Sequence, residues 1–174
     1  PTVTANAANP IPVGATKLTI AGTGFSPTPS ENSVTLTNGK CLNVDSATTT
    51  QIVCHVSEFA LPPGGSSQAT VTSFGIASGA AQVATVVANP TVTEDKVKVL
   101  AIGSTATFQI AGTNFGTNAA LVSVQLSLGQ CAVQNVAATV ITCKLSQYEN
   151  APGGLQVTAV VTISGFSVKP TIVL

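Results

Sequence analysis

Residues 20–25 read IAGTGF, and the same pattern returns ninety positions later as IAGTNF at residues 110–115. Further landmarks return in the same order at offsets of 89 or 90. They are Cys41 as Cys131, Cys54 as Cys143, and the PGG of residues 63–65 as that of residues 152–154. Self-similarity at a nearly constant period indicates two copies of one structural unit.

A Pro-led motif sets the boundaries of the copies. The PTV of residues 1–3 returns at residues 90–92, which predicts one domain over residues 1–89 and a second over residues 90–169. Because Ala88 and Asn89 leave almost no linker, we expect the domains to follow one another stiffly. The motif returns once more at the end of the sequence, where it predicts the first strand of a following repeat or a strand donated to a neighbouring subunit. The residues of this candidate assembly strand are Pro170, Thr171, Ile172, Val173 and Leu174.

Alternating apolar and polar residues run through both copies, for example at residues 17–21, 33–37 and 68–72. This period of two is typical of strands with one buried face. Asn38-Gly39 follows such a strand and predicts a two-residue hairpin. About seven short strands in each copy, with no helical period, predict an all-β fold of two tandem immunoglobulin-like β-sandwiches.

The composition excludes several classes of function. Only 7% of the residues are charged, against about 25% in typical globular domains, and the six Lys balance six carboxylates with no Arg present. A nucleic-acid-binding surface needs more positive charge than this. No apolar run approaches the roughly 18 residues of a membrane span. One His and a few scattered carboxylates supply little for acid–base chemistry, so we expect no enzyme and no cofactor.

The cysteines form two pairs at equivalent places in the repeat, Cys41 with Cys54 and Cys131 with Cys143. We expect a disulfide in each domain, contributing on the order of 3 kcal/mol on a loop-entropy argument. Zinc binding by the cysteines is the alternative, but it would require a Cys-x-x-Cys spacing or supporting His residues. Disulfides predict an oxidising, extracellular or cell-surface location. The chain opens with Pro and contains no Met, as expected of a mature or excised part of a longer product.

Three other segments could carry chemistry. His55 has Lys144 as its counterpart and is expected to be an ordinary surface residue, and Glu94-Asp95 offers too few oxygen ligands for calcium. The Pro-flanked segment 26–30 is expected to be extended, with its hydroxyls in solvent. Its candidate O-glycosylation sites are Ser26, Thr28 and Ser30, and a stiff surface loop is the alternative. No Asn fits the Asn-x-Ser/Thr acceptor pattern.

The repeated Ile-x-Gly-x-x-Phe motif, the Pro-led first strand, the Cys pair and the Gly-Gly turn together resemble the IPT/TIG family of immunoglobulin-like domains. The resemblance covers both copies from end to end. It implies a non-catalytic module, as found in plexin-type receptors, Rel-type transcription factors, starch-acting enzymes and microbial adhesins. The DNA-binding branch does not fit a chain without Arg. Fold alone does not decide among the remaining roles.

Three functions therefore stay open. The first is a repeating subunit of an extracellular fibre or stalk, assembled head-to-tail with itself as the partner. The second is an adhesion or receptor ectodomain fragment that binds a protein or glycan, with Tyr148, Glu149 and Asn150 as the one loop that looks like a contact. The third is a pair of accessory domains in a secreted enzyme.

Overall fold

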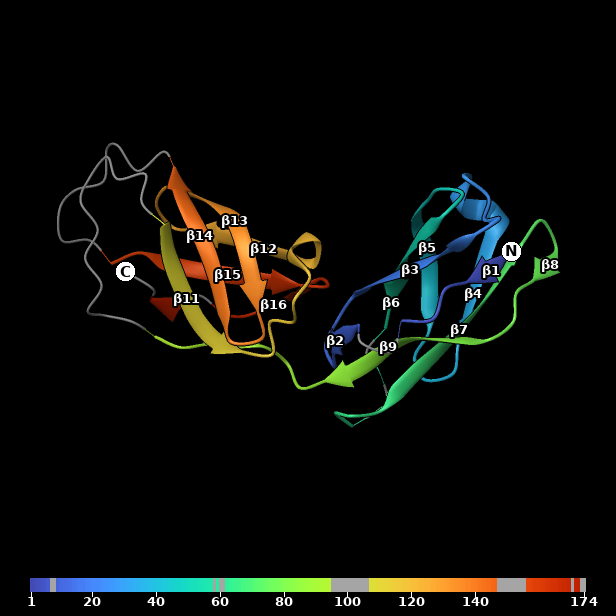
Figure 1. The fold of residues 1–174 in the computed structure, drawn as a ribbon, viewed down its shortest axis with the longest axis horizontal. Coiled ribbons are helices and arrows are strands. Elements are labelled where there is room, and N and C mark those ends of the chain that lie inside the picture. Colours follow the sequence, from blue (N-terminus) through green and yellow to red (C-terminus); the bar gives the residue numbers. More distant parts are fainter. Residues whose placement is uncertain are drawn as a thin grey trace. The chain divides into compact units, whose positions relative to one another are not determined.

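The structure is a computed structural model, and it describes residues 1–6, 9–57, 59, 62–94, 107–146, 156–169 and 171–172. The chain divides into two domains, Pro1–Asn89 and Pro90–Leu174 (Figure 1). Both are built from strands, as the alternating sequence predicts. Within the described residues, no helix is long and apolar enough to span a membrane.

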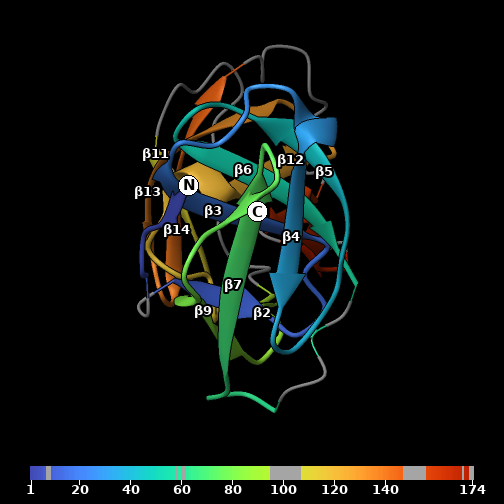
Figure 2. The same ribbon diagram turned by 90° about the vertical axis from the view of Figure 1, so that its right-hand side faces the viewer.

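The described strands of the first domain form two sheets. One has the order β1-β3-β6-β5 and is antiparallel; the other has the order β2-β9-β7-β4, with β8 paired to β7. In the second sheet β2 runs parallel to β9, while β4 runs antiparallel to β7. Figure 2 shows β4 and β7 lying next to each other. The bounds are β1 Thr2–Val3, β2 Pro10–Pro12, β3 Lys17–Thr23, β4 Asn32–Leu36, β5 Cys41–Ala47, β6 Gln51–Val56, β7 Ser66–Ser73, β8 Ile76–Ala77 and β9 Ala81–Val87, with a short 3₁₀ helix η1 at Pro29–Glu31.

The second domain repeats this plan. Its described sheets have the orders β10-β11-β14-β13 and β12-β15-β16, with β17 also paired to β15. The bounds are β10 Thr91–Val92, β11 Thr107–Thr113, β12 Val122–Leu126, β13 Gln130–Ala137, β14 Val140–Ser146, β15 Thr158–Ile163, β16 Phe166–Ser167 and β17 Thr171–Ile172, with a short 3₁₀ helix η2 at Ala119–Leu121.

The Ile-x-Gly-x-x-Phe motif locks the first strand onto the sheet. In the first domain Phe25 is 2% exposed and its ring lies over Gly22, beside the carbonyl oxygen of Thr2 on β1. A Cβ at Gly22 would collide with both of these neighbours. Phe115 and Gly112 repeat the arrangement under the carbonyl oxygen of Thr91. Glycine is therefore required here because backbone and ring approach each other closely.

The hairpin expected at Asn38-Gly39 is wrong. The strands on either side lie in different sheets, since β4 pairs with β7 and β5 pairs with β6. Residues 37–40 therefore carry the chain from one sheet to the other. Gly39 has a φ of 119°, and the Phe59 ring packs where its side chain would be. A glycine is needed at position 39 because the Phe59 ring packs closely there. The local sequence does not distinguish this need from that of a tight turn.

Candidate interaction surfaces

Each domain contains one disulfide between neighbouring strands. Cys41 on β5 is bonded to Cys54 on β6, with 5.6 Å between their Cα atoms, and Cys131 on β13 is bonded to Cys143 on β14, with 5.2 Å between theirs. Cys54 and Cys143 are fully buried in the two cores. All four sulfur atoms are thus engaged, and none is left as a thiolate for catalysis or zinc binding.

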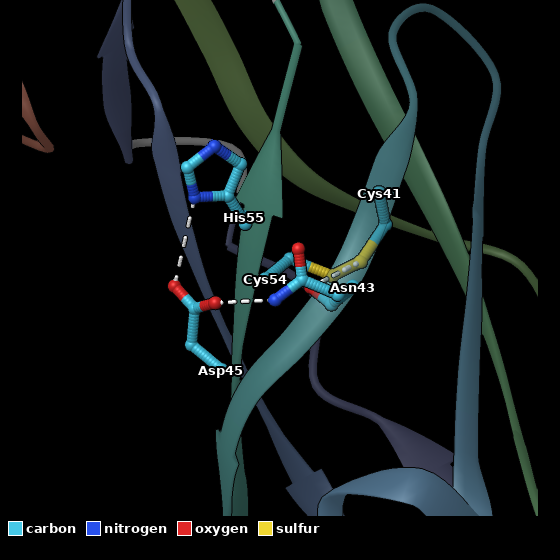
Figure 3. Close-up of polar contacts among 5 residues, drawn as sticks. All are labelled: Cys41, Asn43, Asp45, Cys54 and His55. Carbon is cyan, nitrogen blue, oxygen red and sulfur yellow. Dashed lines mark hydrogen bonds and ion pairs between the residues drawn. A yellow bond between two sulfur atoms is a disulfide. The ribbon is translucent and has the colours of Figure 1, made fainter.

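A small polar cluster lies beside the first disulfide (Figure 3). The Asn43 amide donates a 2.6 Å hydrogen bond to the Asp45 carboxylate, and that carboxylate lies 3.9 Å from Nδ1 of His55. The His55 and Asp45 side chains are 44% and 29% exposed. A pair at this distance and exposure contributes little to stability because water screens it.

The side chains of this cluster do not add up to a metal site. Across the described residues, no group of three or more His, Cys, Asp or Glu side chains comes close enough to hold a metal ion. Lys17 pairs with His55 across β3 and β6, so the face carries isolated charges of both signs. What such a face can do chemically is to form exposed polar contacts with a partner.

Ser26, expected to be a glycosylation site in solvent, is instead fully buried. Its hydroxyl donates a 2.5 Å hydrogen bond to the Glu31 carboxylate and accepts a 3.1 Å hydrogen bond from the Thr28 amide. The Asn32 side chain also bonds both the amide and the carbonyl of Ser26. The Pro-flanked segment is therefore not fully extended: it folds back through η1 because Asn32 and Glu31 satisfy its polar groups.

Thr28 and Ser30 differ from Ser26 in that both are exposed. The described contacts of Thr28 use its backbone: its amide donates to the Ser26 hydroxyl, and its carbonyl accepts hydrogen bonds from the Asn32 side-chain amide and from the backbone amide of Glu31. These two hydroxyls remain candidate attachment sites, carried on a loop that the Ser26–Asn32 contacts hold in place.

The candidate assembly strand also needs a correction. Thr171 and Ile172 form β17, which pairs with Ala159 and Thr158 of β15 in its own domain. In the first domain, Ala81 of β9 pairs with Ala69 of β7, and both partners lie ninety positions earlier. The segment thus has the register of the domain's last strand. Pro170, Val173 and Leu174 lie outside the described residues.

The tip of the β7–β8 hairpin is an apolar surface feature that sequence reasoning missed. Phe74 and Ile76 are 65% and 63% exposed. Phe74 and Gly75 have φ values of 52° and 76°, as a two-residue hairpin with positive φ at both turn positions requires. A bulky residue in this left-handed region costs about 1–3 kcal/mol and is a genuine outlier.

Comparison of the two copies contains the signal that would have found this tip. The corresponding turn of the second domain is Ser164-Gly165, with positive φ values at both positions as well. Ser164 is a small polar residue, so Phe74 stands out as an aromatic residue at a turn position. The other expected contact, at Tyr148, Glu149 and Asn150, lies outside the described residues, as do Asp95, Lys96 and Lys98.

The profile of the IPT/TIG domain matches the chain twice, over residues 1–93 and 90–171. The chain therefore belongs to the IPT/TIG family, as two tandem domains with the immunoglobulin-like sandwich fold. No curated protein sequence is a significant match to it.

Among solved structures, the extracellular region of plexin A4, domains 1 to 10, is similar over 99% of this chain, with 16% identity and a TM-score of 0.67. The matched region is 15% of that plexin chain, and the likeness shows the fold. Two further structures match with much lower scores. The I9–I11 tandem of titin is 7% identical, and the match covers 95% of this chain and 62% of that one with a TM-score of 0.29. Drosophila OTK extracellular domains 3–5 are 9% identical, and the match covers 100% of this chain and 60% of that one with a TM-score of 0.26.

Proposed function

We propose that this chain is part of an extracellular receptor or adhesion protein, in which the two IPT/TIG domains are non-catalytic binding and spacing modules. The observation that carries this proposal is the combination of tandem IPT/TIG domains with a disulfide in each. Disulfides form and persist in oxidising compartments, which favours a secreted or cell-surface location. The similarity to the plexin A4 extracellular region along 99% of the chain supports the same setting.

The chemistry of the surface supports binding rather than turnover. The four cysteines form two disulfides, and the Asp45–His55 pair is partly exposed to water. Exposed polar side chains on a rigid sheet face are suited to recognising a protein or glycan partner. On this proposal, glycans attached at Thr28 or Ser30 would cover the η1 loop.

The location is tested first, on the native protein in its own cells. An antibody raised against the folded chain should stain intact cells or the surrounding medium, and the protein should contain no thiol that alkylates without prior reduction. Staining that requires permeabilised cells, together with free thiols, would rule out the extracellular role.

Binding is tested with the purified monomer on a glycan array and in a pull-down from cell-surface extracts. Saturable binding by the oxidised chain is expected, and it should vanish when the same chain is reduced and unfolded. A variant with Lys17→Gln, Asp45→Asn and His55→Gln tests the β3–β6–β5 face, because it removes the charges there without altering the core. We expect it to bind more weakly than the unchanged chain. Equal binding by this variant would direct the search to another surface.

A further inference from the structure

We propose that Asn38 of the first domain is a site of spontaneous deamidation, at which the Asn38-Gly39 pair is converted through a succinimide into aspartate and isoaspartate. This modification goes beyond the proposed function and does not depend on it. It also gives a chemical role to the Asn-Gly pair, which occurs once in the chain and does not form the hairpin that its sequence predicts.

The reaction needs only these two residues and water. The backbone nitrogen of Gly39 bonds to the side-chain carbonyl carbon of Asn38. Its proton passes through water to the side-chain nitrogen, which leaves as ammonia and closes a five-membered ring. Water then opens the ring at either carbonyl carbon. One opening gives aspartate, and the other gives isoaspartate, in which the backbone runs through the side chain and is one methylene longer.

The backbone around the pair is held at its two ends and not between them. The amide of Thr37 and the carbonyl of Lys40 each form a backbone hydrogen bond of 3.0 Å to residues outside the crossover. Asn38 and Gly39 lie between these anchors and outside β4 and β5. Among the residues that the structure describes, neither of their backbone amides has a hydrogen-bond partner. The attacking nitrogen of Gly39 therefore has no such bond to give up.

The side chain that is attacked is partly exposed and weakly held. The Asn38 amide nitrogen lies 3.4 Å from the Thr37 hydroxyl oxygen and 3.4 Å from the Ser66 carbonyl oxygen. Both distances exceed the usual range of about 2.7–3.2 Å for such hydrogen bonds, so little keeps the carboxamide from turning toward the Gly39 nitrogen. Its exposure also admits the water that opens the ring.

Every other asparagine of the chain is followed by a residue other than glycine, whose side chain obstructs the approach of the backbone nitrogen. Asn9 and Asn89 precede proline, which has no N–H to react. Asn32 is buried, and hydrogen bonds of 2.8, 3.0 and 3.1 Å fix its carboxamide to the loop before it. Asn43 and Asn118 are exposed and therefore serve as internal controls for the effect of the glycine.

The modification distinguishes the two domains, because Leu128 precedes Gly129 at the equivalent crossover of the second. In the first domain, isoaspartate lengthens the backbone beside Gly39, where the ring of the buried Phe59 lies 3.2 Å from the place of a Cβ. The conversion also adds a carboxylate to a chain in which six lysines balance six carboxylates. A converted chain is therefore more acidic, and its first domain is less stable.

The test is to incubate the folded full chain, with its disulfides intact, well below its unfolding temperature and to follow it by isoelectric focusing and peptide mapping. A species with one more negative charge should accumulate, with its modification at Asn38 and with isoaspartate detected by isoaspartyl methyltransferase labelling. Loss of the amide should be at least about tenfold faster there than at Asn43 or Asn118, as a barrier lower by about 1.4 kcal/mol gives. Mildly alkaline buffer should accelerate it, because the attacking nitrogen must lose its proton.

Asn38→Gln is the matched variant. It keeps the carboxamide, but the attack would have to close a six-membered ring, which forms less readily, so the acidic species should not appear. Asn38→Leu copies the residue of the second domain and should have the same effect on charge. After incubation, the first domain of the unchanged chain should melt at a lower temperature than before, while that of Asn38→Gln should not change.

Three results would overturn the proposal. The first is a folded chain that keeps the Asn38 amide as long as it keeps those of Asn43 and Asn118. The second is an acidic species that forms equally fast in Asn38→Gln. The third is conversion at Asn38 in the reduced, unfolded chain alone, which would show that the fold of the crossover protects this residue.

Discussion

At a few positions a single residue determines how closely a backbone segment and a side chain can approach each other. Gly22 and Gly112 leave room for the Phe25 and Phe115 rings to close over the first strand of each domain. At Phe74 the residue type does not suit the backbone, because an aromatic residue occupies a conformation that favours Gly, Asn or Asp. Both cases give substitutions whose effects differ sharply from those of nearby controls.

Gly22→Ala should destabilise the first domain by about 3 kcal/mol, since the new methyl group displaces either the β1 backbone or the Phe25 ring. Calorimetry of the full chain measures the change through the unfolding transition of the first domain. Gly79→Ala is the control, because no atom lies within 4 Å of the place that its new methyl group would take. Equal effects of the two substitutions would contradict the steric account.

Phe74→Asn should stabilise the first domain by about 1 kcal/mol, raising its melting temperature by about 5 °C. Asn tolerates the left-handed conformation, and the exposed phenyl ring contributes little burial in the isolated chain. Thermal unfolding of the full chain measures the change. A lower melting temperature would show that the ring stabilises its own domain.

At the scale of elements, a buried polar group joins the Pro-flanked loop to the sheet. Asn32 at the start of β4 is 7% exposed, and it bonds Ser26, Thr28 and the Ser73 hydroxyl on β7. The second domain has apolar residues at the same ladder position, where Val122 pairs with Ile163. The two copies thus use polar and apolar solutions for the same pair of strands.

Asn32→Val should therefore cost the first domain about 2–3 kcal/mol, because it leaves the Ser26 amide and the Ser73 hydroxyl unpaired in the core. Adding Ser73→Ile copies the second domain's pair and should recover about 1 kcal/mol. A double-mutant cycle by urea unfolding measures this coupling. Strictly additive effects would show that the two side chains act independently.

The sequence predicts the strands well because alternation is a local property. Residues 17–21 and 68–72 lie within the observed β3 and β7, and residues 33–37 overlap β4 and extend one residue past its end. It predicts their partners less well: Asn38-Gly39 carries the chain between sheets, and Ser26 is buried by contacts with Glu31 and Asn32. These outcomes depend on which strand lies opposite, and no short window of sequence contains that information.

For the whole molecule, the ladder register decides where a domain ends. Deleting residues 170–174 should lower the stability of the second domain by on the order of 2 kcal/mol, because β15 loses its pairing with Thr171 and Ile172. The first domain should be unaffected. Hydrogen exchange of the two domains in the same sample measures both, and equal protection of β15 with and without the segment would contradict its assignment to the second domain.

The interaction surfaces follow the same division between what is local and what is not. The sequence predicts the cysteine pairs, since the repeat marks them twice. The exposed tip could have been found by setting Phe74 against Ser164 and asking why a turn carries an aromatic residue.

The mismatch between Asn32–Ser73 and Val122–Ile163 also bears on how two similar neighbours avoid mixing during folding. Tandem domains of like sequence can misassemble by exchanging strands. If β4 paired with β15, the Asn32 amide would face Ile163 and lose the Ser73 hydroxyl, while Val122 would leave that hydroxyl unpaired against β7. Both errors bury polar groups without partners, so the divergence of one ladder position acts as a safeguard that keeps each sandwich to its own strands.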